Sequence, residues 1–366
     1  MSTEHIEAHA NHQGEAGGIQ TKVLQKTAAG RPFEVATITR RALRENDVLI
    51  DVKAAGICHS DIHTIESEWG PAHYPLTVGH EIAGVVQAVG SQVSKWQVGD
   101  RVGVGCLVNS CGECEQCLAG FENHCLKGAV GTYNSVDTDG SITQGGYTQK
   151  IVVDENFVCR IPDELDFDHA APLLCAGITL YSPIAAWDIK EGDQVAVVGL
   201  GGLGHMGVQI AAAKGAEVEV LSRTLKKAEL AKELGAVATH VTTDPDFFRH
   251  NRGRYDYIIS TISADFDVDA YLKLLKPRGV MIVVGLPPKA QSLKFGSLIM
   301  GSKVLTGSNI GGIAETQEML DFCGEHGIGA YIEKIGVKDV DRAYERVVAS
   351  DVQFRFVIDT STFDEL

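Results

Sequence analysis

The sequence predicts two domains, one built on a doubly wound parallel α/β sheet and one made mostly of antiparallel β-strands. Two patterns indicate this division. From about residue 176 to 312, β-branched runs alternate with amphipathic stretches, and alternating βα units build a parallel sheet covered by helices. From about residue 20 to 175, short strands are broken by glycines, as in compact antiparallel domains. A chain of 366 residues is long enough for both.

The β domain is expected to be discontinuous in the sequence. Three runs are rich in β-formers and lie between Gly, Asp and Pro signals; they cover residues 48–52, 82–89 and 101–104. After a helix-like segment at 315–325, residues 332–357 return to mixed strands that could rejoin the first domain. We therefore assign residues 19–175 and 314–366 to the β domain.

The α/β domain is assigned to residues 176–313, as an insertion in the β domain. Its β-branched runs predict buried strands at residues 195–198, 218–221, 255–259 and 280–284. Helical periodicity between these runs predicts helices at residues 203–214, 226–234 and 268–275.

Composition limits the possible partners. The net charge of −16 argues against binding to nucleic acid or anionic membranes. No run of eighteen consecutive apolar residues occurs, so no membrane span is expected. Residues 1–18 are polar and lack the apolar core of a signal peptide, which predicts a flexible tail on a cytoplasmic protein. In a reducing compartment, clustered cysteines more often bind metal than form disulfides.

Four of the nine cysteines form a tight cluster with the spacing Cys-x2-Cys-x2-Cys-x7-Cys. They are Cys111, Cys114, Cys117 and Cys125. Short loops of this kind can fold four thiolates around one ion at about 2.3 Å, and such a closed set leaves no position for substrate. The cluster predicts a structural zinc in a lobe at residues 106–126, with free structural thiols as the alternative.

A second set has a different character. Cys58 and Cys175 need a third partner such as His80, and two thiolates with one neutral imidazole leave a fourth zinc position open. Such a zinc can polarise a carbonyl or stabilise an alkoxide. Asp61 could hold the His80 imidazole by a hydrogen bond. Glu81 could be a nearby carboxylate or a transient ligand, although an ordinary surface glutamate remains an alternative.

A glycine-rich loop follows the predicted strand at 195–198 and opens a helix. It reads Gly199-Leu200-Gly201-Gly202-Leu203-Gly204. Glycines here allow a tight turn and let a pyrophosphate approach the helix N-terminus, where free N–H groups favour anions. The loop predicts a dinucleotide site, and a purely structural turn is the alternative.

The end of the next predicted strand indicates which dinucleotide binds. Sites for NAD usually carry an acidic residue about twenty positions after the glycine loop. This chain has Ser222, Arg223 and Thr224 there, followed by Lys227. Hydroxyls and cations bind a 2′-phosphate through charge-assisted hydrogen bonds, whereas a carboxylate repels it. NADP(H) is therefore the predicted cofactor, and a solvated basic turn is the alternative.

Together these residues resemble the zinc-containing medium-chain alcohol dehydrogenases, most closely the cinnamyl alcohol dehydrogenase branch with its bacterial NADP-dependent aldehyde reductases. The similarity covers nearly everything after about residue 20. The motifs that carry it, besides the four-cysteine cluster and the glycine loop, are Gly56-Ile57-Cys58-His59-Ser60-Asp61, Gly79-His80-Glu81, Cys175-Ala176-Gly177-Ile178-Thr179, Ser222-Arg223 and Phe354-Arg355-Phe356-Val357.

The resemblance implies a GroES-like catalytic domain, completed by the C-terminus, with a Rossmann-type domain inserted. It also implies that the open set holds a catalytic zinc, so that each chain binds two zinc ions. Ser60 would take the alcohol proton and pass it through the nicotinamide ribose to His63, a chain that leads the proton to solvent. A structural role for His63 is the alternative. Thr179 would lie near the nicotinamide.

One departure from the family bears on the substrate. Plant members place a tryptophan just before a Ser-Tyr-Asn segment, whereas this chain has Gly131 before Thr132-Tyr133-Asn134. The missing indole should widen the pocket and remove a stacking wall, which puts cinnamyl specificity in doubt. Trp69 could supply an apolar wall instead, with ordinary packing as the alternative.

The sequence therefore predicts a zinc-dependent, NADP(H)-linked oxidoreductase that interconverts primary alcohols and aldehydes, aromatic or aliphatic, by hydride transfer at a zinc-bound oxygen. Two alternatives remain: a zinc-free quinone or enoyl reductase of the same superfamily, and a non-catalytic nucleotide-binding homologue. The expected partner is a small-molecule substrate. A homodimer or homotetramer is the expected assembly, and the apolar stretch at residues 298–305 could pair across a dimer.

Overall fold

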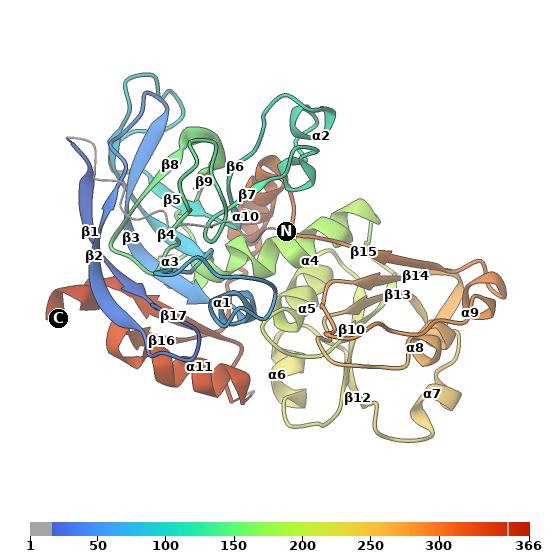
Figure 1. Ribbon diagram of the computed structural model, residues 1–366. Helices are drawn as coiled ribbons and strands as arrows, with labels where there is room; N and C mark the ends of the chain where they lie inside the picture. Colours follow the sequence, from blue (N-terminus) through green and yellow to red (C-terminus); the bar gives the residue numbers. More distant parts are fainter. Residues whose placement is uncertain (1–16, 350) are drawn as a thin grey trace, which may run out of the picture.

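The computed structural model describes residues 17–349 and 351–366, so residues 1–16 of the expected tail lie outside the described part. The chain forms two units that lie side by side (Figure 1). One unit joins the blue-to-green first half of the chain to the red C-terminal segment, and the other contains the yellow and orange middle. Segments far apart in the sequence therefore share one unit, and the α/β unit interrupts the β unit.

The middle of the chain builds a six-stranded parallel sheet in the order β12-β11-β10-β13-β14-β15. Its strands are β10 (Gln194–Val198), β11 (Glu217–Ser222), β12 (Ala238–Val241), β13 (Tyr255–Ser260), β14 (Leu275–Val283) and β15 (Val304–Gly307). Counted along the chain, this order is that of doubly wound dinucleotide-binding sheets. The strand order reverses between β10 and β13, and ligands of such sheets bind at this point, beyond the carboxyl ends of the strands.

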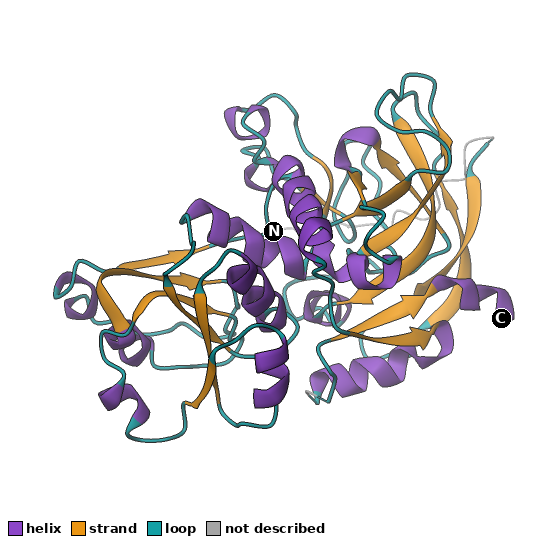
Figure 2. Ribbon diagram, turned by 180° about the vertical axis from the view of Figure 1, so that it is seen from behind, coloured by secondary structure: helices purple, strands orange, loops and turns teal. Residues whose placement is uncertain are grey.

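Helices pack around this parallel sheet (Figure 2). They are α4 (Ala176–Ala186), α5 (Gly204–Ala213), α6 (Ala228–Glu233), α7 (Phe247–His250), α8 (Val268–Leu274) and α9 (Gly296–Ile299). Because the sheet is covered, Val195, Val197 and Ile259 in its central strands are completely buried. The structure has strands or helices at each of the seven segments that the sequence predicted, and adds the helix α4 and the short elements β12, β15, α7 and α9.

The β unit is centred on a seven-stranded sheet in the order β16-β17-β3-β4-β5-β9, with β8 also paired to β3. Its strands are β3 (Asp47–Ile57), β4 (Ile82–Val89), β5 (Arg101–Val104), β8 (Lys150–Asp154), β9 (Cys159–Arg160), β16 (Ile332–Gly336) and β17 (Arg355–Asp359). All pairs are antiparallel except β16 with β17. Strands β17 and β8 lie end to end along one edge of β3, since they pair with its residues 54–57 and 47–51.

Smaller elements surround this sheet. Two further strand pairs are β1 (Ile19–Gln25) with β2 (Glu34–Arg40) and β6 (Leu107–Asn109) with β7 (Val130–Gly131). The remaining α-helices are α1 (His59–Ile65), α2 (Glu115–Leu118), α3 (Phe167–Ala170), α10 (Ile313–His326) and α11 (Val340–Val348). Single 3-10 turns occupy Glu122–His124, Glu155–Phe157, Ala171–Leu174, Val337–Asp339 and Thr360–Glu365.

The C-terminal segment rejoins the β unit through β17, which runs antiparallel to β3. The expectation of mixed strands throughout residues 332–357 is nevertheless wrong, because α11 lies between β16 and β17. The buried residues of α11 recur at the spacing of one helical face: Val340, Ala343, Tyr344 and Val347. This periodicity is visible in the sequence and is the signal that identifies the helix.

No single helix in residues 17–349 and 351–366 is long and apolar enough to cross a membrane. One pair of helical segments, Phe167–Leu174 with Ala176–Ala186, meets the criteria of length and composition, with a bend of 56° between them. Most of its side chains are buried in the protein core, including Leu173, Ile178 and Leu180.

Candidate active site

Cys58, His80 and Cys175 come from three separate segments and meet at one point. Cys58 directly follows β3 and caps α1, His80 lies two residues before β4, and Cys175 caps α4. The Sγ atoms of Cys58 and Cys175 are 4.0 Å apart, and His80 Nε2 lies 3.2 Å from Cys175 Sγ. In a tetrahedral zinc site with bonds of about 2.3 Å, neighbouring ligand atoms lie about 3.8 Å apart. The two sulfurs and His80 Nε2 are therefore spaced like three ligands of such a site.

Hydrogen bonds to Asp61 orient the imidazole of His80. His80 Nδ1 lies 3.0 Å from Asp61 Oδ1, and the backbone N–H of Cys58 donates to Asp61 Oδ2 at 2.9 Å. The carboxylate is fully buried. These partners place the imidazole proton on Nδ1, so the lone pair of Nε2 faces the two thiols, as a metal ligand requires.

The charges around this set favour a bound cation. A hydrogen bond from Cys175 and the positive charge of Arg355 hold the pKa of Cys58 well below its usual value, and the thiolate is the form that binds metal. A carboxylate oxygen of Glu81 lies within 4.8 Å of the three ligand atoms. Both Glu81 oxygens are buried without a hydrogen bond, although Arg355 Nη1 is 3.3 Å away. A buried carboxylate left without donors fits a site that accepts a divalent ion.

The four remaining zinc-site cysteines also converge. Cys117 Sγ lies 3.9 Å from Cys111 Sγ and 3.5 Å from Cys114 Sγ, again close to tetrahedral edges. Backbone N–H groups point at the sulfurs, including Leu126 N at 3.5 Å from Cys114 Sγ. These donors stabilise thiolate charge, so the set fits a closed zinc site.

The four-cysteine lobe also contacts the start of α10, where the chain leaves the parallel sheet. Glu122 of the lobe accepts a hydrogen bond from Ile313 N at 3.0 Å, and Asn123 donates to Asn309 O at 2.8 Å. The lobe therefore helps to fix the second crossing between the two units.

Ser60 and His63 lie on one face of α1, three residues apart. Ser60 Oγ is 3.5 Å from Cys58 Sγ, which places its hydroxyl beside the ligand set. His63 is half-buried, and its Nδ1 contacts Glu68 Oε2, a carboxylate that is largely exposed. Helix α1 therefore carries a hydroxyl beside the ligand set and an imidazole nearer solvent, where the Glu68 carboxylate from the following loop contacts it. Sequence reasoning missed Glu68, because no motif identifies an acidic residue in a loop.

The two substrate-pocket candidates occupy different places. Trp69 is 52% exposed, and its ring stacks on His63 at 4.6 Å, so the structure places it at the solvent end of α1. Gly131 ends β7, and a side chain there would meet Ser135 Oγ at 2.9 Å. The neighbouring Tyr133, which sequence reasoning did not select, has its ring 5.5 Å from that of His80. Tyr133 thus forms a wall near the ligand set.

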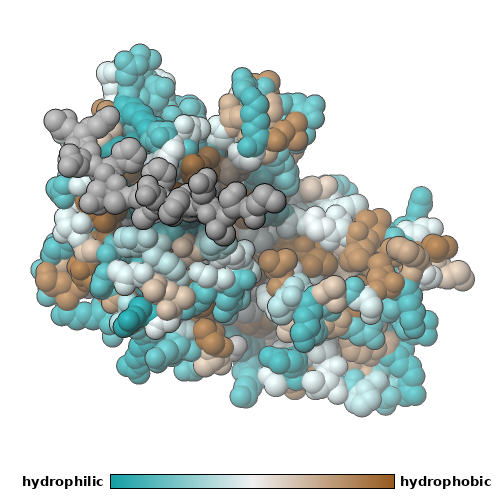
Figure 3. Space-filling view, viewed as in Figure 1, coloured by the Kyte–Doolittle hydropathy of each residue, from teal (hydrophilic) through white to brown (hydrophobic). Residues whose placement is uncertain are grey.

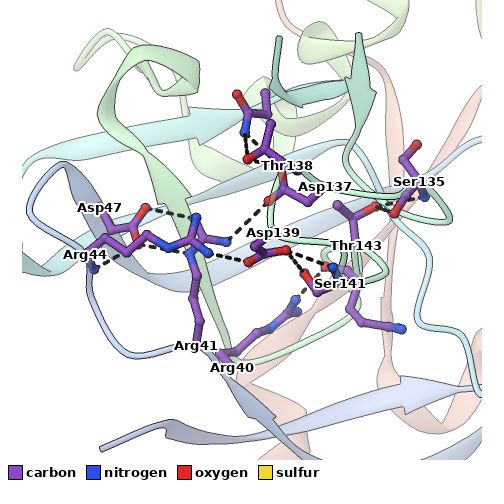
Figure 4. Close-up of polar contacts among 12 residues, drawn as sticks. Arg40, Arg41, Arg44, Asp47, Ser135, Asp137, Thr138, Asp139, Ser141 and Thr143 are labelled. Carbon is purple, nitrogen blue, oxygen red and sulfur yellow. Dashed lines mark hydrogen bonds and ion pairs between the residues drawn. The ribbon is translucent and has the colours of Figure 1, made fainter. Parts of the chain in front are cut away.

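The segment from Gly131 to Tyr147 is anchored to the β unit by arginines from the end of β2 and the following loop (Figure 4). Arg44 pairs with Asp139, which also accepts a hydrogen bond from Ser141 Oγ at 2.6 Å. Arg40 donates to the backbone oxygen of Gly145 at 2.8 Å. These contacts fix the middle of the segment, at Asp139, and its C-terminal part, at Gly145.

The glycine-rich loop connects β10 to α5, with each glycine in a distinct environment. A Cβ at Gly204 would lie 1.9 Å from Gly199 O, and one at Gly202 would meet Arg355 Nε at 2.8 Å. Gly201, by contrast, is exposed and has nothing within 4 Å of its Cβ position. Leu200 is buried and Leu203 is partly buried against the core. The loop is therefore packed on its inner side and open on its outer side, where a phosphate can approach the backbone.

The basic residues after β11 divide into two groups. Ser222 ends the strand, and Arg223 and Thr224 are exposed beyond it. Lys227 instead turns inward: its Nζ lies 3.4 Å from Leu200 O and 4.4 Å above the Phe354 ring, and burial lowers its pKa. The structure thus brings Lys227 against the glycine loop.

Thr179 lies in the first turn of α4, one turn after Cys175. Its N–H donates to Cys175 O at 3.0 Å, and the residue is buried. Because α4 starts at the ligand set and packs against α5, Thr179 lies between the candidate zinc site and the parallel sheet.

The fold and site define a class of protein, a two-domain oxidoreductase in which a dinucleotide-type sheet adjoins a metal-binding β unit. Two family models match the chain: the alcohol dehydrogenase GroES-like domain over residues 44–163, and the zinc-binding dehydrogenase over residues 202–325. The chain belongs to the zinc-binding medium-chain alcohol dehydrogenase family, and the resemblance inferred from the motifs is confirmed.

Several curated relatives are similar over nearly their whole length. The chain is 58% identical to a probable formaldehyde dehydrogenase of Bacillus subtilis, covering 94% of this chain and 98% of that protein. It is 56% identical to the NADP-dependent alcohol dehydrogenase C of Mycobacterium tuberculosis, covering 91% and 96%.

Solved structures agree with this family. A cinnamyl alcohol dehydrogenase of Sorghum bicolor superposes with a TM-score of 0.91 at 43% identity, covering 94% of this chain and 98% of that one. A Helicobacter pylori CAD complexed with NADP(H) has a TM-score of 0.89 at 42% identity, covering 94% and 99%. The predicted fold class, a GroES-like unit with a Rossmann-type parallel sheet, is confirmed.

Proposed function

We propose that the protein is a zinc-dependent, NADP(H)-linked alcohol dehydrogenase that interconverts primary alcohols and aldehydes. The observation that carries this proposal is the convergence of Cys58, His80 and Cys175, beside the Glu81 carboxylate, at the start of the helix that packs against the nucleotide unit. These three residues would hold a catalytic zinc. Cys111, Cys114, Cys117 and Cys125 would hold a structural one.

When bound, the zinc supplies a Lewis acid for the substrate oxygen and the nicotinamide supplies or accepts hydride. The chain's own residues move the proton. In alcohol oxidation the Ser60 hydroxyl receives the substrate proton, and His63 releases it toward solvent beside Glu68. In aldehyde reduction the same groups return it. Asp61 keeps the His80 lone pair on the metal side throughout.

NADP(H) is the proposed dinucleotide. The exposed Arg223 and Thr224 lie just beyond β11, where a 2′-phosphate is recognised in sheets of this order, and no carboxylate occupies that turn. The Mycobacterium relative is named NADP-dependent, and the Helicobacter structure contains NADP(H). Thr179 would lie beside the nicotinamide, and the open side of the glycine loop at Gly201 would receive the pyrophosphate.

The two alternative functions are less consistent with this site. A zinc-free quinone or enoyl reductase does not require a metal-binding set of two thiols and an oriented imidazole. A non-catalytic nucleotide-binding protein does not require the Ser60 hydroxyl and the His63 imidazole on α1, which are the proposed proton-transfer groups. The set of side chains therefore favours the dehydrogenase.

We further propose a broad aldehyde range, aromatic and aliphatic. Tyr133 provides one wall near His80. Gly131 has no side chain at the position where plant members carry a tryptophan, and Trp69 stacks on His63. The relatives' names range from formaldehyde to cinnamyl alcohol, which differ greatly in size.

The test measures NADPH oxidation by the purified protein with a panel of aromatic and aliphatic aldehydes, together with its zinc content. We expect aldehyde-dependent oxidation and about two zinc ions per chain. Cys58→Ser should lose one zinc and most turnover, whereas Cys323→Ser, at a buried thiol of α10 outside both sets, should keep two. Oxidation with quinones but not aldehydes would favour the reductase. NADPH binding with no turnover would favour the non-catalytic homologue.

We propose the domain boundaries at residues 19–175 and 314–366 for the catalytic domain and 176–313 for the nucleotide domain, with a zinc lobe at 106–126. Pairing of β17 with β3 supports the return of the C-terminus to the first domain. We also propose a cytoplasmic setting, since none of the nine cysteines, all of which lie in the described residues, forms a disulfide, as a reducing compartment favours.

A homo-oligomer formed through the edge strand β15 is the proposed assembly. Large apolar side chains beside this edge are exposed, namely Phe295 (73%), Ile299 (73%) and Met300 (86%). Hydrophobic residues gather over this end of the α/β unit (Figure 3). A second copy that pairs its own β15 along this edge would bury them and continue the sheet.

A further inference from the structure

Asp61, the residue that orients His80, is itself held by several donors. Its carboxylate accepts from Cys58 N at 2.9 Å, from Gly79 N at 3.3 Å and from Tyr147 Oη at 3.0 Å, in addition to His80 Nδ1 at 3.0 Å. The carboxylate is 0% exposed. Tyr147 contributes a side-chain hydroxyl to this set of donors, and it lies 86 residues from Asp61 in sequence.

Tyr147 is fixed in place by backbone contacts to the segment that precedes His80. Its N–H donates to Val78 O at 3.0 Å, and Gly146 N donates to Gly79 O at 2.9 Å. A Cβ at Gly79 would lie 2.5 Å from the Tyr147 ring, so the ring and the glycine are in direct contact. The tyrosine therefore touches both the backbone that presents His80 and the carboxylate that orients it.

A second tyrosine continues this chain of hydrogen bonds to the C-terminal helix α11. Tyr344 Oη donates to Tyr147 Oη at 3.1 Å, while Tyr147 donates its own proton to Asp61. Both phenols are buried. Burial and the Asp61 charge raise the pKa of Tyr147 well above 10, so its hydroxyl keeps the proton it donates. The aromatic ring of Phe33 packs edge-on against Tyr344 at 5.0 Å and limits its movement.

We propose that Tyr147, supported by Tyr344, is a positioning residue for the metal site: it fixes Asp61, and through Asp61 the imidazole of His80. This inference rests on the proposed function, because it requires a zinc at Cys58, His80 and Cys175. Without the phenol, Asp61 Oδ2 keeps only the Cys58 N–H, and the carboxylate can turn away from His80 Nδ1. Loss of partners that orient a metal-binding histidine typically lowers metal affinity by about 10- to 100-fold.

The test compares the zinc-loaded wild-type protein with Tyr147→Phe, which keeps the ring and removes the hydroxyl. Zinc release to a chromophoric chelator is followed over time. We expect one of the two zinc ions to leave about tenfold faster in the variant. Release of the zinc held by the four-cysteine lobe should be unchanged, which provides an internal reference. Tyr344→Phe should have a smaller effect in the same direction.

Tyr255→Phe is the matched control. Tyr255 is also a buried tyrosine that donates to a carboxylate, Glu219, at 2.6 Å, but it lies in the parallel sheet. This variant should lower the melting temperature without changing either rate of zinc release. The visible spectrum of the cobalt-substituted protein adds a second readout: Tyr147→Phe should shift the bands of the thiolate–imidazole site, and Tyr255→Phe should not.

The possible outcomes separate this inference from the proposed function. Wild-type protein with zinc only at the four-cysteine lobe would overturn both. Wild-type protein with two zinc ions, together with a Tyr147→Phe variant that shows unchanged release and an unchanged cobalt spectrum, would overturn the positioning role alone. A larger effect from Tyr344→Phe than from Tyr147→Phe would also contradict the order of the hydrogen-bonded chain.

Discussion

Replacing Arg223 by aspartate should weaken NADPH binding far more than NADH binding. Arg223 is exposed beyond β11, so the dielectric constant of water applies to its interactions. Two unit charges about 5 Å apart in water interact by about 0.8 kcal/mol. The 2′-phosphate carries a charge of about −1.5 to −2, and the substitution reverses one positive charge, so the loss is about 3 kcal/mol, or about 100-fold in affinity, at low salt.

The loss of NADPH affinity should also depend on the salt concentration, which gives a second test. The Debye length is about 8 Å at physiological ionic strength, which reduces the loss to about 1.5 kcal/mol, or about tenfold. The assay is titration of nicotinamide fluorescence with NADPH and NADH at two salt concentrations. Arg252→Asp is the matched control: Arg252 is also exposed, but it precedes β13 and so lies at the amino ends of the parallel strands, opposite the carboxyl end of β11 that Arg223 follows. Equal losses for both cofactors, or a loss independent of salt, would refute the reasoning.

Three further substitutions test the relay, the lobe and the oligomer edge. His63→Ala should lower turnover by about 10- to 100-fold at low pH and by less at high pH, where hydroxide replaces the relay, as a pH profile of turnover would show. Cys111→Ser should remove one zinc and lower the melting temperature, because structural zinc contributes folding energy, as metal analysis and thermal unfolding would show. Ile299→Asp should convert the oligomer to monomers in light scattering, because it places a charge on the exposed apolar edge.

Each of these expectations has an outcome that would contradict it. An unchanged pH profile in His63→Ala would remove the relay, and Glu68→Gln, which keeps the imidazole, should lose less turnover. Reduced turnover with unchanged stability in Cys111→Ser would contradict a structural lobe. An unchanged mass in Ile299→Asp would contradict the β15 interface. Val237→Asp is its control, since Val237 is also exposed but lies beside β12 at the other edge of the sheet.

Local sequence patterns predicted the parallel sheet well because each of its elements is defined by its own side chains. In β10, for example, a β-branched run followed by glycines predicts a strand and a phosphate-binding turn without reference to residues far away in the sequence. The helix α11 was missed although its apolar spacing is equally local, because the segment was interpreted as part of the returning strands. The apolar residues of this segment were assigned to strands although they follow the period of a helix. In the structure, Tyr344 and its neighbours on the same helical face are buried, which corrects the prediction.

The candidate site was predictable only in part. Cys58, His80 and Cys175 were grouped by residue type and by resemblance, since nothing in their spacing requires them to meet. Residues that act through other residues have no signature at all: Glu68 beside His63 lies in a loop, and Tyr147 looks like any aromatic residue after two glycines. Their partners are known only once the chain has folded.

The sequence by itself was enough to predict the four-cysteine lobe and the glycine loop. In both cases the residues concerned are only a few positions apart, so the short chain between them limits how far apart they can lie in the fold. Only the tertiary structure shows that Cys58, His80 and Cys175 meet, since the two cysteines are 117 residues apart. It also decided the hydrogen bonds that orient His80. Contacts of that range form only when β3, β4 and α4 pack against one another, and a buried carboxylate such as Asp61 takes whichever donors that packing brings to it.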